Sequence, residues 1–132
     1  MKVLILVVDD EPDVTELFRQ QFRRDLRAGR FEMAFAHSAA EALERVEATN
    51  GPNLFLMVSD INMPGMTGLE LLPLVRTARP DVPVIMITAY GDAETRAQAE
   101  AAGAVGLITK PIDFTVLKAE IEQRLAERAG TA

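Results

Sequence analysis

The segment VLILVVDD, residues 3–10, decides the fold, because six apolar residues in a row end in two aspartates. Comparable apolar runs occur four more times, and amphipathic stretches separate them. The five runs span residues 3–8, 31–36, 54–59, 84–88 and 105–108. Three of them are almost continuously hydrophobic, as strands are when helices cover both faces of a parallel sheet. The alternation predicts right-handed crossovers and a three-layer α/β/α sandwich around a five-stranded parallel sheet.

Helix signals lie between the predicted strands. They are Pro12 at a first helical position, Ser38 with Glu41 as a capping box, Pro73 inside a helix over 68–78, and Asp113 as an N-cap. The first helix has an apolar face made of Val14, Leu17, Phe18, Phe22 and Leu26, and the last has one made of Phe114, Leu117, Ile121 and Leu125. Pro73 should kink its helix or shorten the regular part.

The fourth helix, expected over about 92–102, differs from the others. Its apolar side offers only alanines, among them Ala93, Ala97 and Ala101. A buried CH₂ group contributes roughly 0.8 kcal/mol, so alanines hold a helix to a sheet less tightly than leucines do. We therefore expect this helix to move more easily than the rest.

Length and composition fit one ordinary domain. The chain has 132 residues, 48% of them hydrophobic, and we expect a single domain over 1–128 followed by a frayed tail over 129–132. Cysteine is absent, which excludes disulfides and thiolate metal sites. The apolar run 3–8 is too short to span a bilayer, and the net charge of −6 disfavours direct binding to nucleic acid. These features predict a cytoplasmic protein without a membrane or nucleic-acid partner.

Acidic and basic side chains follow the predicted strands. Asp9 and Asp10 end the first strand, Asp60 the third, Thr88 the fourth, and Lys110 the fifth. The carboxyl ends of parallel strands share one edge of the sheet, so these groups should converge there. Two carboxylates about 4 Å apart repel by roughly 4 kcal/mol at an effective dielectric constant of 20. Such a cluster persists only if protons, a cation or nearby positive groups offset the repulsion. Among metal ions, oxygen ligands without histidine or cysteine favour Mg²⁺.

An aspartate in this setting can be a nucleophile that forms an acyl phosphate. Phosphoryl transfer requires in-line positioning and stabilisation of the charge on the equatorial oxygens. A metal ion, Lys110, Thr88 and the backbone amides after Asp60 would provide both. No separate base is needed, because a carboxylate carries no proton to remove.

Four motifs stand in order over almost the whole chain: VVDDEPD, SDINMPGMTGLELL, PVIMITAYGD and GLITKPIDF. Together they resemble the successive motifs of bacterial response-regulator receiver domains, which belong to two-component signalling. The resemblance implies a flavodoxin-like sheet with strand order 2-1-3-4-5, an order taken from that class of fold and not worked out from the residues. It assigns residues 1–128 to the receiver domain.

The resemblance also implies roles for individual residues. Asp60 would be the phosphoacceptor, with Asp9, Asp10, Asp60 and the backbone carbonyl of Asn62 as Mg²⁺ ligands. Thr88 and Lys110 would contact the phosphoryl group, and the peptide bond between Lys110 and Pro111 would be cis. Such a domain is a signalling module rather than an enzyme, although it assists its own phosphorylation and dephosphorylation.

The partners implied are a histidine kinase or phosphotransfer protein upstream, and a downstream protein or output domain. The output surface would be formed by the fourth helix, the fifth strand and the fifth helix. The same surface offers a route to a homodimer.

Three positions depart from the family pattern. An aromatic residue usually stands three residues before the lysine and swings inward when the threonine moves, but here that residue is Leu107. Tyr90, two residues after Thr88, is either a surface residue that faces a partner or a gate that substitutes in part for the missing aromatic, by controlling access or by bonding the phosphate. Thr67 stands where an acidic residue is frequent, and Pro73 interrupts the third helix. We expect both to tune the surface.

Three other functions share the residues or the fold expected here. A phosphatase of the haloacid-dehalogenase type also forms an aspartyl phosphate, but it places a D-x-D pair after the first strand, whereas Asp9 and Asp10 are adjacent here. A flavin-binding module needs a phosphate loop at this position, and the segment DDEPD would repel a phosphate. A degenerate receiver that only binds partners would not need the complete acidic set.

Overall fold

The computed structural model describes residues 3–48 and 53–130. Its strands are β1 (Leu4–Val8), β2 (Glu32–Ala36), β3 (Leu54–Asp60), β4 (Val84–Thr88) and β5 (Gly106–Thr109). Its helices are α1 (Pro12–Gln21), α2 (Arg23–Arg27), α3 (Ala39–Ala48), α4 (Gly68–Ala78), α5 (Ala93–Ala102) and α6 (Phe114–Gly130). The C-terminal tail expected over 129–132 thus lies partly in α6, and residues 131–132 fall outside the described part.

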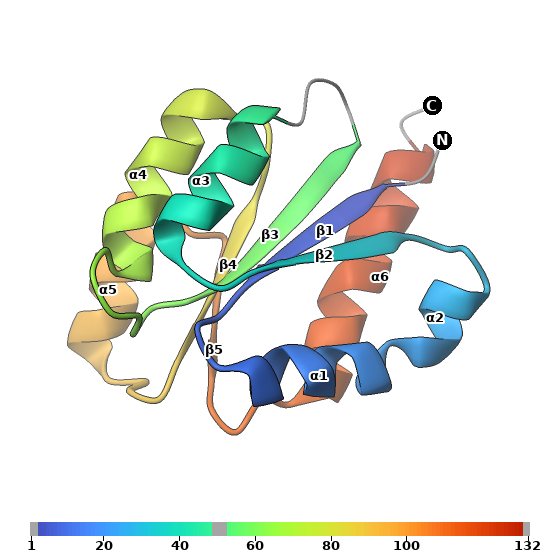
Figure 1. Cartoon of the computed structure of the whole chain (residues 1–132), viewed down its shortest axis with the longest axis horizontal. Helices are drawn as coiled ribbons and strands as arrows, with labels where there is room; N and C mark the ends of the chain where they lie inside the picture. The colour runs from blue at the N-terminus through green and yellow to red at the C-terminus, as the bar shows by residue number, and fades with distance from the viewer. Residues whose placement is uncertain (1–2, 49–52, 131–132) are drawn as a thin grey trace.

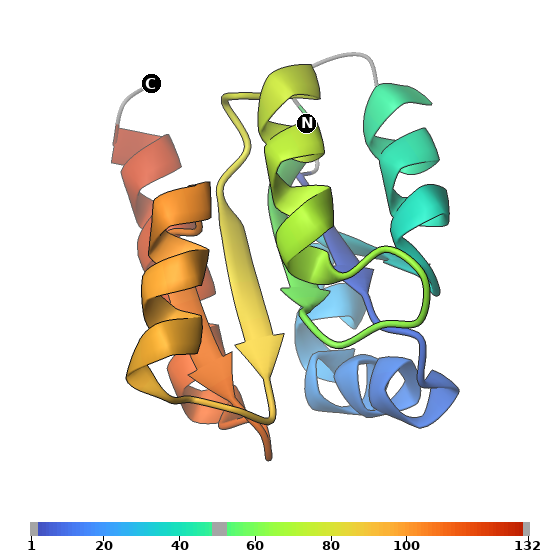
Figure 2. The same cartoon turned by 90° about the vertical axis from the view of Figure 1, so that its left-hand side faces the viewer.

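The five strands form one parallel sheet in the order β2-β1-β3-β4-β5, so the predicted order is confirmed. Helices α3, α4 and α5 cover one face, and α1 and α6 cover the other (Figure 1). Seen from the side, α3, α4 and α5 stand next to one another (Figure 2). The three-layer sandwich is therefore as predicted. Within the described residues, no helix is both long enough and apolar enough to cross a membrane.

Alternate residues of each central strand enter two separate hydrophobic cores. In β1, Leu6 and Val8 pack toward α3 and α4, whereas Ile5 and Val7 pack toward α1 and α6. The inner residues of α6 predicted from the sequence all belong to the second core. Both faces of the sheet are apolar, which explains why the strands read as continuous hydrophobic runs.

The first helical segment is not one helix, and the residues that the structure describes form six helices rather than the five predicted. α1 stops at Gln21, Phe22 adopts φ −103° and ψ 13°, and the short helix α2 follows. Phe22 stays buried, where its ring packs against those of Phe18, Phe31 and Phe114. Leu17 is 39% exposed, so its placement on the inner face was wrong.

The third predicted helix is α4, with the bounds expected from the sequence, and it is helical through Pro73 without the expected shortening. It begins with a complete capping box: the Thr67 hydroxyl accepts from the Glu70 N–H, and the Glu70 carboxylate accepts from the Thr67 N–H. At the start of α3, the Ser38 hydroxyl accepts from the Glu41 N–H as predicted. The Glu41 carboxylate accepts from the His37 N–H, whereas a capping box would use the Ser38 N–H. Thr67 was not predicted to be the N-cap of α4.

The alanines of α5 do dock the helix, but not the ones expected. Ala99 is 1% exposed and lies in the core, whereas Ala93, Ala97 and Ala101 are exposed. α5 is capped at Asp92, whose carboxylate accepts from the Thr95 N–H, and it ends at Gly103 with φ 103°. The apolar face of α5 is therefore rotated relative to the prediction, but it is still made of alanine.

Candidate functional site

The side chains predicted to converge do lie at one edge of the sheet. Asp9 follows β1, while Asp60 and Thr88 end the neighbouring strands β3 and β4. Lys110 follows β5, and its N–H donates to the Thr88 carbonyl at 2.8 Å. Parallel pairing brings these carboxyl ends together, as expected for a site of an open α/β sheet.

Gly68, the first residue of α4, lets the loop after β3 pack closely against the strand. A Cβ atom on Gly68 would overlap the backbone oxygen of Asp60, the Cα of Ile61 and the Cε of Met86. The Gly68 N–H also donates to the Ile61 carbonyl at 2.8 Å. A side chain at this position would push α4 away from the end of β3.

Three carboxylates form the acidic part of the site. Asp9, Asp10 and Asp60 each offer one oxygen, and these oxygens lie within 4.8 Å of one another. Asp9 and Asp60 are each 2% exposed, and Asp10 is half-buried. One oxygen of Asp9 accepts from the Glu11 N–H at 2.9 Å, and one of Asp60 accepts from the Asn62 N–H at 3.3 Å. These bonds orient the two buried carboxylates.

The buried acids are held at an electrostatic cost. Burial, with a further contribution from the charge of Asp60, raises the pKa of Asp9 to about 6 although the Glu11 N–H and Lys110 oppose the shift. Burial also raises the pKa of Asp60, against the opposing effect of Lys110. A cation between these oxygens would offset both effects, so the donor set fits a hard divalent metal such as Mg²⁺.

Lys110 is the positive group of the site. Its ammonium lies 3.2 Å from an Asp60 oxygen, 3.8 Å from an Asp9 oxygen and 3.9 Å from a Glu11 oxygen. Burial alone would lower the pKa of Lys110, but the three carboxylates outweigh it and the pKa is raised. Lys110 is therefore a fixed cation. The peptide bond from Lys110 to Pro111 is cis, as the resemblance implied.

A hydrogen bond joins the side chain of Thr88 to the backbone of Tyr90. Thr88 is buried at the end of β4, and its hydroxyl accepts from the Tyr90 N–H at 3.0 Å. The Tyr90 side chain is 65% exposed. Leu107 in β5 is half-buried and packs toward the core under α3, α4 and α5. The structure thus brings Asp9, Asp10, Asp60 and Lys110 into one cluster, whereas the Tyr90 side chain is exposed and Leu107 packs against the core.

Glu11 is part of the site, although no role was predicted for it. Its carboxylate contacts Lys110, and its backbone N–H orients Asp9. The signal available was its place directly after Asp9 and Asp10 at the end of the first strand. Asn62 is exposed, and its backbone N–H binds Asp60.

Fold and site together define a class of α/β protein. Its members are doubly wound parallel sheets that carry a buried acidic cluster and a lysine at the carboxyl edge. The family model for the response regulator receiver domain matches residues 5–122. The chain belongs to this family and is a receiver domain of two-component response regulators. Receiver domains are signalling domains that control outputs through phosphorylation.

Similar proteins include curated regulators and solved receivers. Response regulator protein PilR of Pseudomonas aeruginosa is 36% identical over 113 residues, which are 86% of this chain and 24% of PilR. Transcriptional regulatory protein PrrA of Mycobacterium tuberculosis is 35% identical over 128 residues, or 97% of this chain and 52% of PrrA. The chain spans about a quarter of the length of PilR and about half of the length of PrrA.

Two solved structures show the same fold over nearly the whole chain. A CheY-like receiver domain of Methanospirillum hungatei has a TM-score of 0.85 and 29% identity, with both chains fully covered. Response regulator TrrA of Thermotoga maritima has a TM-score of 0.77 and 31% identity, covering 94% of this chain and 99% of its own. The TrrA structure is a complex with Mg²⁺ and BeF.

Proposed function

We propose that Asp60 is the phosphoacceptor of this domain and that a histidine kinase or a phosphotransfer protein is the donor. The observation that carries the proposal is the contact of 3.2 Å between the Asp60 carboxylate and Lys110, beside Asp9 and Asp10. An Asp60 oxygen would form the new O–P bond while the donor P–N bond breaks. The electron pair of that P–N bond stays on the histidine nitrogen.

The carboxylates of Asp9, Asp10 and Asp60, with the Asn62 carbonyl, would hold Mg²⁺. When bound, the ion neutralises negative charge on the oxygens of the transferring group. Lys110 supports this role from the other side, where its ammonium would bind a phosphoryl oxygen. The Thr88 hydroxyl would donate to another oxygen after giving up its contact with the Tyr90 N–H.

Phosphorylation would be read out through the loop between β4 and α5. Drawing the Thr88 hydroxyl toward a phosphoryl group on Asp60 releases the Tyr90 N–H and shifts the start of α5. The loop also packs closely against β5, since a Cβ atom on Gly91 would overlap the Thr109 methyl group. The output surface is then the face of α5, β5 and α6, where a downstream protein, an output domain or a second copy would bind.

Leu107 changes how this switch works. A leucine has no ring to swing inward, so the displacement must pass through the backbone of residues 88–92. Tyr90 is the aromatic residue on that segment, and its exposed ring acts as a gate at the rim of the site. The proposed switch therefore couples Asp60 to α5 without an aromatic relay at position 107.

Incubation with acetyl phosphate and Mg²⁺ tests the phosphoacceptor. The wild type should gain one phosphoryl mass and Asp60→Asn should gain none, whereas labelling that persists in Asp60→Asn would overturn the assignment. Sustained hydrolysis of p-nitrophenyl phosphate in the same samples would instead support a phosphatase of the haloacid-dehalogenase type.

A further inference from the structure

A group of arginines sets one part of the molecule apart from the rest. Residues 19–30 contain five arginines and one acidic residue, whereas the remainder of the chain holds nine basic and nineteen acidic residues. All five arginines are exposed, and together they form the arginine surface: Arg19, Arg23, Arg24, Arg27 and Arg30. A chain with a net charge of −6 therefore carries a strongly positive surface on α1, α2 and the turn that follows.

The arginine surface extends to the end of the sheet opposite the acidic cluster. β2 begins just after Arg30, and its first residue, Glu32, pairs with Leu4, the first residue of β1. Asp9 instead follows the last residue of β1, so about 16 Å of strand separates Leu4 from Asp9. In Figure 1, α1 runs from the acidic edge toward α2, which stands beside the start of β2. The surface is therefore distinct from the proposed phosphorylation site.

Two of the five arginines are held by other side chains. Arg19 contacts a Glu16 oxygen at 3.4 Å, and its guanidinium carbon lies 4.4 Å from the centre of the Phe35 ring. Arg30 forms a bidentate ion pair with Glu122 on α6. These contacts fix both side chains at the two ends of the arginine surface.

Arg23, Arg24 and Arg27 are the free arginines of this surface. Over residues 3–48 and 53–130, the structure shows no ion pair or hydrogen bond made by their side chains. An α-helix turns by about 100° per residue, so the three side chains of α2 point into one arc of about 100°. Phe22 and Leu26 lie outside that arc and pack into the core. Three guanidinium groups therefore face solvent together.

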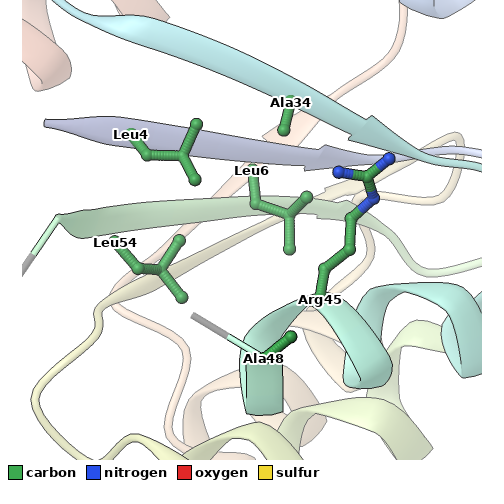
Figure 3. A pocket seen from close by; sticks show the side chains of 6 residues that line it. All are labelled: Leu4, Leu6, Ala34, Arg45, Ala48 and Leu54. Atoms are coloured by element: carbon green, nitrogen blue, oxygen red, sulfur yellow. The ribbon is translucent and has the colours of Figure 1, made fainter. Parts of the chain in front are cut away.

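A polar hollow of about 350 Å³ adjoins these free arginines. It is lined by Glu16, Arg19, Gln20 and Arg23, which follow one another along the exposed side of α1. The hollow and α2 share Arg23 and so form one surface. Arg45 does not belong to it, because Arg45 reaches from α3 on the opposite face of the sheet, beside an apolar pocket (Figure 3).

We propose that the arginine surface binds a short acidic segment of a partner protein. The planar guanidinium group of arginine forms bidentate hydrogen bonds with carboxylates. Arg23 and Arg27 are four residues apart on a helix, a spacing that matches two carboxylates four residues apart on an acidic helix of the partner. Since no carboxylate of the described residues pairs with these two arginines, binding would not have to break an existing ion pair.

A short acidic segment fits this surface better than nucleic acid does. A long polyanion would extend past the arginines over the rest of the chain, where nineteen acidic residues outnumber nine basic ones and repel it. Unstacked bases also need exposed aromatic rings, and over residues 12–27 the aromatic side chains, Phe18 and Phe22, are buried. The charges of a short peptide can instead stay within the arginine surface.

Hexaglutamate, hexalysine and a short DNA duplex are the probes, because they separate the sign of the charge from the class of partner. Hexaglutamate should shift the amide resonances of residues 19–27 most strongly, with a dissociation constant of roughly 0.1–1 mM. Raising the salt concentration from about 50 to 200 mM should weaken this binding several-fold. Hexalysine binding of equal strength, or hexaglutamate shifts that avoid residues 19–27, would overturn the proposal. Tighter binding of the duplex to these residues would assign the surface to nucleic acid instead.

Variants test whether the arginine surface carries the binding. Arg27→Gln should weaken hexaglutamate binding about two- to fivefold, as expected for the loss of one exposed ion pair. Combining it with Arg23→Gln and Arg24→Gln should weaken binding at least about tenfold. Arg96→Gln, which removes an exposed arginine of α5, is the matched control and should change nothing. Equal weakening by Arg27→Gln and Arg96→Gln would show that only net charge matters and would overturn the proposal, even if the triple variant failed to fold.

Two further measurements separate this proposal from other uses of the same charges. A second copy of the chain would present its own acidic edge, so the domain alone would then associate as its concentration rises. Sedimentation velocity that shows such association, lost in the triple variant and suppressed by Mg²⁺, would assign the surface to a second copy and overturn the proposed partner. Asp60→Asn should bind hexaglutamate as the wild type does, which makes the test independent of the phosphoacceptor.

Discussion

The Lys110 ammonium lies 3.2 Å from a carboxylate oxygen of Asp60, and it reaches Asp9 at 3.8 Å. The positive charge of the lysine therefore partly neutralises the carboxylates that would also bind a metal ion. The same charge is needed to bind a transferring phosphoryl group, so Lys110 should oppose one event and assist the other.

Lys110→Met should slow phosphorylation of Asp60 by acetyl phosphate at least tenfold, since a preorganised cation is lost. The same variant should bind Mg²⁺ as tightly as the wild type or more tightly, because a competing positive charge has gone. Mass spectrometry over time gives the first quantity, and isothermal titration calorimetry gives the second. Lys118→Met, on α6, is the control for removal of a lysine. Weaker Mg²⁺ binding in Lys110→Met would show that the lysine organises the metal site.

Asp10→Asn should weaken Mg²⁺ binding without destabilising the metal-free domain. The substitution removes one of three carboxylates whose oxygens lie within 4.8 Å, and it therefore relieves repulsion. Denaturant unfolding in EDTA should give a free energy of unfolding equal to or above that of the wild type. Adding Mg²⁺ should raise the melting temperature of the wild type more than that of the variant.

Asp13→Asn is the matched control, because Asp13 is an exposed acid in the first turn of α1. It should leave Mg²⁺ binding unchanged. A loss of metal-free stability in Asp10→Asn would reveal a structural role for Asp10.

The raised pKa of Asp9 predicts how stability depends on pH. Its pKa is about 6 in the folded domain and 3.8 in the reference state, so between these values the folded protein binds more protons than the unfolded one. Without metal, the contribution of Asp9 to stability should fall as pH rises from about 4 to 6, by roughly 3 kcal/mol. Comparing wild type and Asp9→Asn in EDTA by urea unfolding at pH 4, 5, 6 and 7 isolates this component. A difference between the two proteins that stays constant with pH would contradict it.

The sequence predicted the sheet and the acidic edge well because both depend on local patterns. Continuous apolar runs mark strands buried on both faces, and the residue after each run lies at the shared carboxyl edge. The break at Phe22 was not predictable in this way, because Phe22 continues the apolar spacing of α1. Its packing against Phe31 and Phe114 involves residues further along the chain, which no local pattern encodes.

The face of α5 was misjudged for a related reason. Alanine occurs on several sides of this helix, so hydrophobic periodicity cannot choose among them. Contacts with neighbouring elements decide that Ala99 faces inward while Ala97 and Ala101 face solvent. The contact of Lys110 with Glu11 likewise depends on side-chain placement across two strands, which no local pattern encodes.

The docking of α5 leads to a prediction about motion. Ala99 is buried and Ala102 is half-buried against the same core, and two methyl groups give little apolar contact. The two positions of α5 should therefore differ by only a few kcal/mol, with both populated before phosphorylation. Relaxation-dispersion NMR on the unphosphorylated domain should find exchange on the microsecond to millisecond timescale, concentrated between Thr88 and Leu107.

Substitutions in α5 distinguish loose docking from general flexibility of the helix. Ala99→Leu forces a larger side chain against the core and should change both the exchange rate and the populations. Ala97→Leu and Ala101→Leu add the same side chain on the exposed surface and should leave the exchange nearly unchanged. If α5 shows no exchange, and activation with Mg²⁺ and beryllium fluoride shifts only Asp60 and its neighbouring acids, the proposed readout through Thr88 and Tyr90 is wrong. The phosphoacceptor assignment would stand even then, because it depends on whether Asp60→Asn gains a phosphoryl mass and not on how α5 moves.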